Sequence, residues 1–152
     1  MKPEKNKAVF LLVEDDPNDA FLVEREFAKA NQTVRLEVVN DGQEAVHYLK
    51  GEGQYGDRDA HPMPNLLLLD LKMPRLGGFE FLKWLRSKSA ENIRLIPVVV
   101  LSSSHLEEDV ERAYNLGANS YMVKPLNWDE FRKLLVDLGI YWTKHALTPQ
   151  FR

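Results

Sequence analysis

Short apolar runs alternate along the chain with stretches in which apolar residues recur at helical spacing. Each run predicts a strand, and the central runs are apolar throughout, which is typical of strands buried on both faces of a sheet. The five runs are Ala8–Val13, Val34–Val39, Leu66–Leu69, Pro97–Leu101 and Tyr121–Val123. The segments that follow them predict five helices. The pattern therefore indicates an α/β fold with a parallel sheet covered by helices on both faces.

Short polar residues mark the expected helix ends, since Ser, Asp and Asn side chains accept hydrogen bonds from the free N–H groups of a first turn. Asp16 before Pro17 fits a cap followed by the first position of a helix that runs to about Ala30. Gly117 fits the residue after a helix end. Three pairs have the spacing of a capping box: Asp41 with Glu44, Ser104 with Glu107, and Asn127 with Glu130.

Two of the predicted helices have a clear apolar face, with apolar residues three or four positions apart. In Phe79–Ser87 these residues are Phe81, Leu82 and Leu85, and in the last helix they are Phe131, Leu134, Leu135 and Leu138. The one irregular stretch is Gly51–Asn65, which at about fifteen residues exceeds the usual length of a connection. We expect it to be a surface insertion beside the functional site, and the sequence leaves its role open.

Composition narrows the class of protein. A chain of 152 residues is long enough for one domain with a sizeable core. Its net charge of −3 gives no electrostatic support for binding nucleic acid or an anionic membrane. The apolar stretches are too short to span a bilayer, and the N-terminus lacks the features of a secretory signal. Without cysteine the chain has neither disulfides nor thiolate metal sites. We therefore expect a soluble cytoplasmic protein.

Polar residues stand directly after the predicted strands, at the edge where open parallel sheets bind ligands. They are Glu14 and Asp15, Asp70, Ser102 and Lys124. Each alone has an ordinary structural explanation, such as an acid at a helix N-terminus, a turn residue or a surface lysine. An aspartate directly after four leucines is harder to explain in this way, because a carboxylate beside an apolar core is costly to desolvate.

Together the five residues make one chemical device. Three carboxylates that converge at strand ends repel one another unless a cation lies between them. Mg²⁺ suits this place, because it takes hard oxygen ligands and commonly combines a few carboxylates with phosphate oxygens. A lysine and a hydroxyl can hold the oxygens of a phosphoryl group. Since an ionised aspartate is already a nucleophile, the set predicts formation of an acyl phosphate on Asp70.

Five motifs occur in order from about Val9 to Trp142. They are Leu12-Val13-Glu14-Asp15-Asp16, Asp70-Leu71-Lys72-Met73-Pro74, Leu76-Gly77-Gly78, Leu101-Ser102-Ser103 and Tyr121-Met122-Val123-Lys124-Pro125. In sequence and spacing they resemble the receiver domain of two-component response regulators. The resemblance implies a flavodoxin-like, doubly wound, five-stranded parallel sheet in the order 2-1-3-4-5, and a cis peptide before Pro125. It implies a receiver domain over residues 8–143, with terminal tails at 1–7 and 144–152.

The resemblance also implies a set of Mg²⁺ ligands. Asp15 and Asp70 would bind the ion, Glu14 would bind it directly or through water, and Lys72 would contribute its backbone carbonyl. The acidic pair here is Glu-Asp, where the family pattern has Asp-Asp, so the mode of contact of Glu14 stays open.

A second set of roles concerns the switch. Lys124 would pair with Asp70 and then with the phosphoryl group, while Ser102 would donate to a phosphoryl oxygen. Tyr121 would then turn inward into the space that this movement leaves. Ser102 lacks the methyl group of a threonine but keeps the hydroxyl that the role requires.

The implied function is a single-domain response regulator in a phosphorelay, whose Asp70 accepts a phosphoryl group from a histidine kinase. Such a protein is no enzyme beyond its own phosphorylation and dephosphorylation. The loop Gly51–Asn65 and the aromatic residues Trp128, Tyr141 and Trp142 resemble regulators that serve bacterial phytochromes. This implies a phytochrome-type kinase and a homodimer through the last helix or its neighbouring face. Alternatively, the aromatic tail folds back on its own core.

Three other functions fit part of the sequence. A phosphatase of the haloacid-dehalogenase type needs a second acid two residues after its nucleophile, where this chain has Lys72. A flavodoxin-like electron carrier needs a phosphate loop after the first strand, where the acids from Glu14 to Asp16 would repel a flavin phosphate. An adaptor that keeps the fold and acts by protein contacts without phosphorylation remains an alternative.

Overall fold

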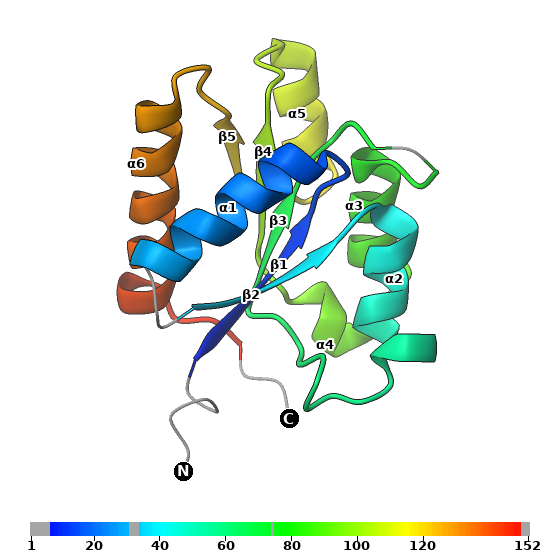
Figure 1. Ribbon diagram of the computed structural model, residues 1–152. Helices are drawn as coiled ribbons and strands as arrows, with labels where there is room; N and C mark the ends of the chain where they lie inside the picture. Colours follow the sequence, from blue (N-terminus) through cyan, green and yellow to red (C-terminus); the bar gives the residue numbers. More distant parts are fainter. Residues whose placement is uncertain (1–6, 31–33, 74, 150–152) are drawn as a thin grey trace.

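The computed structural model of the protein (Figure 1) describes residues 7–30, 34–73 and 75–149. Its strands are β1 (Ala8–Val13), β2 (Val34–Val39), β3 (Leu66–Leu69), β4 (Val98–Ser102) and β5 (Ser120–Val123). Its helices are α1 (Pro17–Ala30), α2 (Gly42–Lys50), α3 (Gly78–Ser87), α4 (Glu91–Arg94), α5 (Glu107–Asn115) and α6 (Trp128–Ile140). Two short turns complete the elements: the 3₁₀ turn η2 (Gly53–Tyr55) and the π-helical turn η3 (Tyr141–His145).

The five strands form one parallel sheet in the order β2-β1-β3-β4-β5, which confirms the predicted topology. The register pairs Val13 of β1 with Val39 of β2 and with Leu69 of β3. The residues that follow Val13 and Leu69 therefore leave the sheet side by side. The five long helices are the ones expected, and the four-residue α4 is an additional one.

Helices cover both faces of the sheet (Figure 1). Residues from α1 and α6 pack on one face, and residues from α2, α3, α4 and α5 pack on the other. The strand β3 separates the two cores: Leu66 and Leu68 face the first, Leu67 and Leu69 face the second, and all four are fully buried. Burying each leucine stabilises the fold by about 2 kcal/mol, so the continuous apolar run reflects a strand with no solvent-facing side.

Most of the predicted helix ends are confirmed. The Asp41 carboxylate accepts from the Glu44 N–H group at 2.9 Å, and the Asn127 side chain accepts from the Glu130 N–H group at 3.2 Å. Helix α1 begins at Pro17, and the Asp16 carboxylate accepts from the N–H group of its second residue, Asn18, at 2.9 Å.

Gly117 follows the last turn of α5 with a φ of +106°, a conformation that favours glycine.

The prediction that Ser104 caps α5 is wrong. The helix begins at Glu107 after Leu106, and the Ser104 hydroxyl donates to the Asp109 carboxylate at 2.6 Å. The N-cap position is Leu106, so Ser104 lies two residues too early to cap the first turn. The predicted cis peptide before Pro125 is also wrong, because the described residues contain no cis peptide bond.

The loop Gly51–Asn65 lies at the opposite end of the sheet from the predicted site, so the expectation that it borders the site is wrong. It connects the end of α2 to the start of β3, where Asn65 pairs with the backbone of Val9. Arg58 holds it closed by donating to the carbonyls of Tyr48 and Leu49, both at 2.7 Å. These bonds satisfy carbonyl groups at the end of α2, which gives the loop a structural role.

The aromatic tail largely folds back on its own core, which was the alternative expectation. Trp128 and Trp142 are partly buried and pack against the core that α1 and α6 share, whereas Tyr141 is 53% exposed. No helix in the described ranges combines the length and apolar character needed to cross a bilayer.

The start of α3 lies unusually close to the end of β3. A Cβ atom on Gly78 would lie 2.5 Å from the carbonyl oxygen of Asp70 and 2.6 Å from the Cα of Leu71. Both contacts are with backbone that cannot move aside easily, so this position requires glycine. The close approach fixes the connection between β3 and α3 on which the site depends.

We predict that Gly78→Ala lowers the free energy of unfolding by about 2 kcal/mol, because the added methyl group forces the β3 and α3 backbones apart. Urea unfolding followed by circular dichroism measures this loss. Gly56→Ala is the matched control: Gly56 has a φ of −67° and its Cβ would meet atoms no closer than 3.5 Å. An equal midpoint for Gly78→Ala and the unsubstituted protein would contradict the packing argument.

Candidate functional site

The strand-end residues meet at one edge of the sheet because backbone pairing continues past the strands. The Glu14 N–H group donates to the Val39 carbonyl at 3.0 Å, and the Asp70 N–H group donates to the Val13 carbonyl at 3.1 Å. On the other side, the Lys124 N–H group donates to the Ser102 carbonyl at 2.8 Å. These bonds fix the backbone of each residue, so the side chains start from defined positions.

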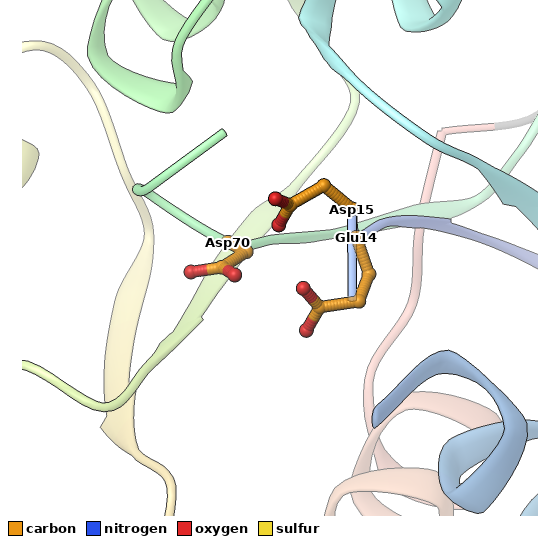
Figure 2. A group of neighbouring side chains, drawn as sticks. All are labelled: Glu14, Asp15 and Asp70. Atoms are coloured by element: carbon orange, nitrogen blue, oxygen red, sulfur yellow. The ribbon is translucent and has the colours of Figure 1, made fainter. Parts of the chain in front are cut away.

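Three carboxylates gather at this edge, as Figure 2 shows. Glu14, Asp15 and Asp70 each offer a carboxylate oxygen, and these oxygens lie within 4.8 Å of one another. Glu14 is buried, Asp70 is half-buried and Asp15 is exposed. The site is thus a small acidic pocket with a buried floor and an open side, which agrees with the predicted grouping.

The electrostatics of the pocket demand a cation. Burial, together with the neighbouring Asp70 carboxylate, raises the pKa of Glu14 to about 8. The cause is that a second negative charge in a poorly solvated place costs free energy unless a positive charge compensates it.

Lys124 supplies one such charge from inside the protein. Its Nζ atom lies 2.5 Å from a Glu14 oxygen, 2.9 Å from an Asp19 oxygen and 3.8 Å from an Asp70 oxygen. The side chain is only 10% exposed. Burial alone would lower the pKa of Lys124, but the three carboxylates outweigh it and raise that pKa above its ordinary value. Lys124 is therefore a fixed cation held within reach of Asp70.

Asp19 is the site residue that sequence reasoning missed as a partner of Lys124. It lies in the first turn of α1 and is partly exposed. Its position one turn after the acidic strand end was the available signal, since the first turn of α1 starts at the same edge of the sheet. The sequence pattern indicates no role for Asp19 beyond that of an acid near a helix start.

Ser102 and Tyr121 lie on the side of the site formed by β4 and β5. Ser102 is buried, and its hydroxyl oxygen accepts from the Ser104 N–H group at 3.2 Å. The Tyr121 hydroxyl donates to the Ser104 carbonyl at 2.8 Å, and its ring packs against the core. Ser104 therefore links the two predicted switch residues through its backbone, a connection that the sequence pattern did not indicate.

Lys72 lies in the connection after β3, and its side chain is exposed. Its N–H group points to the Asp70 carboxylate, with a nitrogen–oxygen distance of 3.4 Å. The backbone of this connection therefore lies beside the Asp70 carboxylate through its N–H group, and the role predicted for the Lys72 carbonyl stays a prediction.

The donor set suits a hard divalent cation. All three side chains offer carboxylate oxygens, and the pocket contains neither the imidazole nor the thiolate that would favour a transition metal. The open side at Asp15 leaves room for the waters and phosphate oxygens that Mg²⁺ keeps in its coordination shell. The residues present therefore fit a magnesium ion.

Comparisons with known proteins agree with this geometry. The family model of the response regulator receiver domain matches residues 10–136. Response regulator Rcp1 from Synechocystis is 35% identical over 150 residues, which cover 98% of this chain and 99% of Rcp1. A probable methanogenesis regulatory protein, FilR2 from Methanothrix harundinacea, is 38% identical over 142 residues, which cover 93% of this chain and 87% of FilR2.

Solved structures give the same relation. The crystal structure of phosphorylated RcpA, a cyanobacterial phytochrome response regulator, superposes with a TM-score of 0.86 at 33% identity and covers 95% of this chain and 99% of RcpA. The Mn²⁺-bound form of Rcp1 superposes with a TM-score of 0.83 at 34% identity and covers 94% of this chain and 99% of that protein. The chain described here therefore belongs to the response regulator receiver domain family.

Proposed function

We propose that Asp70 is the phosphoacceptor of this receiver and that Mg²⁺, held by Glu14, Asp15 and Asp70, supports the transfer. As a response regulator, the chain is a signalling protein that carries a phosphoryl group and not an enzyme with an external product. The observation that carries the assignment is the acidic pocket itself, with three carboxylates within 4.8 Å and Lys124 beside them. The Mn²⁺-bound form of the relative Rcp1 supports a divalent cation at this place.

The transfer follows from the positions of the side chains. An Asp70 oxygen attacks the phosphorus of a phosphohistidine, and the bond between phosphorus and the imidazole nitrogen breaks. A bound Mg²⁺ supplies charge neutralisation for the equatorial oxygens and would take its ligands from the three acids and the Lys72 carbonyl. Lys124 supplies the second cation, already within 3.8 Å of the acceptor.

The new phosphoryl oxygens give Lys124 and Ser102 new partners. Ser102 accepts from Ser104 through its hydroxyl oxygen, so its hydrogen is available to donate. Movement of Ser102 toward the phosphoryl group shifts the Ser104 backbone and with it the carbonyl that the Tyr121 hydroxyl binds. The switch therefore acts on the face formed by α5, β5 and α6, which are the fourth helix, fifth strand and fifth helix of the predicted pattern.

The phosphoryl donor is a sensor histidine kinase, and the phytochrome regulator RcpA points to a phytochrome-type kinase. Three exposed apolar side chains lie in segments that follow strand ends at the site edge: Phe21 on α1, Leu106 before α5 and Leu126 after β5. Exposed apolar groups around an acidic pocket suit a protein partner that brings its phosphohistidine to Asp70.

The face formed by α5, β5 and α6 also supports a homodimer. β5 is an edge strand, and a shallow groove of about 500 Å³ lies between it and α6. The groove is lined by Met122, Val123, Pro125, Glu130, Lys133, Leu134 and Asp137. Its mixture of apolar, acidic and basic side chains allows self-complementary pairing about a two-fold axis.

We take the receiver domain to span residues 8–143 between short tails, a range that the family match over 10–136 supports. We also expect a cytoplasmic protein.

We predict that Asp70→Asn abolishes phosphorylation by acetyl phosphate or a phosphohistidine donor, because an amide is no nucleophile toward phosphorus at neutral pH. Intact-mass spectrometry measures the addition of one phosphoryl group. Asp129→Asn, which changes an exposed aspartate on α6, should be labelled like the unsubstituted protein. Undiminished labelling of Asp70→Asn would sink the assignment, and an unsubstituted chain that no donor labels would favour the adaptor function.

We also predict that Lys124→Met lowers the free energy of unfolding by about 3 kcal/mol in the presence of a chelator, because it leaves buried carboxylates without their cation. Mg²⁺ should restore part of this loss, since a bound cation takes over the compensation and stabilises the folded state. Chemical denaturation with and without Mg²⁺ measures both effects. Lys83→Met removes an exposed lysine on α3, outside both the acidic pocket and the groove, and is the control. Equal losses in both conditions would contradict this account.

A third prediction concerns the dimer. Val123→Lys places a charge on the free edge of β5 and should turn a sedimenting dimer into a monomer, because an edge lysine opposes strand-to-strand contact. Leu95→Lys, at an exposed apolar residue after α4, should leave the dimer intact. Analytical ultracentrifugation, with and without beryllofluoride as a phosphoryl mimic, measures the state. A monomeric unsubstituted protein in both conditions would rule the dimer out.

A further inference from the structure

The connection between β3 and α3 contains a strained residue. Arg75 has a φ of +60° and is the one non-glycine residue with a positive φ among those described. A side chain with a Cβ atom pays a steric cost in this conformation, so the surrounding structure must hold Arg75 there. The connection follows Asp70 directly and carries Lys72, so its shape bears on the acidic pocket.

An ion pair holds Arg75. Its Nε atom donates to an Asp41 oxygen at 2.8 Å, and an Nη2 hydrogen reaches the same oxygen. The other Asp41 oxygen accepts from the Glu44 N–H group at the start of α2. We call this Asp41–Arg75 pair the latch. Asp41 is almost fully buried, with 4% of its side chain exposed, whereas Arg75 is 62% exposed.

The latch is reinforced by a contact between backbones. The Gly42 N–H group donates to the Leu76 carbonyl at 3.1 Å, and a Cβ atom on Gly42 would lie 2.4 Å from that carbonyl oxygen. At the far end of the connection, the Gly78 N–H group donates to the Leu71 carbonyl at 3.1 Å. The connection is therefore tied to the start of α2 in its middle and to the end of β3 at its base.

Helix capping alone does not account for the latch. Asp41 already caps α2 through Glu44, and capping needs no arginine and no strained backbone. Burial would raise the pKa of Asp41, but the Glu44 N–H group and Arg75 outweigh it and hold that pKa below its ordinary value. The carboxylate is thus ionised at neutral pH, and Arg75 is the cation that compensates it.

We propose that the latch sets the divalent-cation affinity of the acidic pocket by holding the connection that carries Lys72. Arg75 is a positioning residue, because its side chain binds Asp41 and none of the three acids. It acts through the backbone, because the Lys72 N–H group approaches the Asp70 carboxylate at 3.4 Å and the Lys72 carbonyl belongs to the same short connection. The inference rests on the proposed function, since it takes the acidic pocket as the metal site.

The test uses two variants of the full chain that break the latch from opposite sides. Asp41→Asn keeps an oxygen that can cap α2 but removes the charge. Arg75→Gly removes the guanidinium and suits the positive φ. Titration calorimetry with Mg²⁺ alone should give a dissociation constant raised about three- to tenfold in each. The double variant should bind Mg²⁺ no more weakly than the weaker-binding of the two single variants, because either change breaks the same contact.

Two further measurements separate a positioning role from general damage. The rate of phosphorylation by acetyl phosphate should need more Mg²⁺ for half-saturation in both variants and return to the unsubstituted rate at saturating Mg²⁺. Lys50→Gln breaks the exposed Lys50–Glu52 pair, which has a nitrogen–oxygen distance of 3.4 Å and lies at the opposite end of α2, and should change neither quantity.

Unchanged Mg²⁺ affinity in Arg75→Gly, or losses that add fully in the double variant, would overturn the proposal. Arg75→Gly decides the matter alone if Asp41→Asn fails to fold. The outcome is separate from that of the proposed function: weaker Mg²⁺ binding in the latch variants with no phosphorylation of Asp70 would keep the latch and reject the acceptor. Normal phosphorylation of Asp70 with unchanged Mg²⁺ affinity in the latch variants would keep the acceptor and reject the latch.

Discussion

Mutual repulsion among carboxylates at the carboxyl edge of the sheet is the constraint on which the rest of the structure depends. Glu14 and Asp70 leave neighbouring strands in register, and Asp15 adds a third acid within 4.8 Å. The repulsion in such a cluster is relieved by a proton on one acid, as the raised pKa of Glu14 indicates, or by a cation in reach. Lys124, directly after β5, supplies one, and the three carboxylates offer the ligands for a divalent ion. The cations that compensate the carboxylates are also the ones that can neutralise a phosphoryl group, so stability and function share one site.

The fold provides the rigidity that this site needs. The central strand β3 is buried on both faces and ends at Leu69, directly before Asp70, so the Asp70 backbone cannot move without disturbing two cores. Gly78 and Gly42 allow backbones to approach closely on either side of the connection after it. The parts that can respond lie on the other side, where Ser102, Ser104 and Tyr121 form a chain of hydrogen bonds toward α5 and β5. A rigid strand end beside a chain of hydrogen bonds suits the two-state switch proposed above.

Sequence patterns predicted the strands and the residues of the acidic pocket, because strand ends and burial on both faces follow from local residue type. The order of the strands came from the resemblance to the receiver domain. Sequence patterns failed where a contact joins residues distant in the chain. Arg75 as a partner of Asp41 depends on how elements pack, which no local spacing reports. Asp19 as a partner of Lys124 had one signal, its position one turn after the acidic strand end. The prediction that the Gly51–Asn65 loop borders the site is wrong, although its position after a helix and before a strand fixes it at the opposite end of the sheet. Ser104 has the spacing of a cap but lies two residues before the N-cap position, which is Leu106.

The central claim is that Asp70 carries the phosphoryl group and that the neighbouring acids bind the metal it needs. Borohydride reduction of the phosphorylated chain, followed by peptide mapping, tests it most directly, because the reagent converts an aspartyl phosphate to homoserine. We expect homoserine at position 70 alone, formed only when a divalent cation accompanies the phosphoryl donor. Homoserine at another aspartate, or at position 70 in the presence of a chelator, would contradict it.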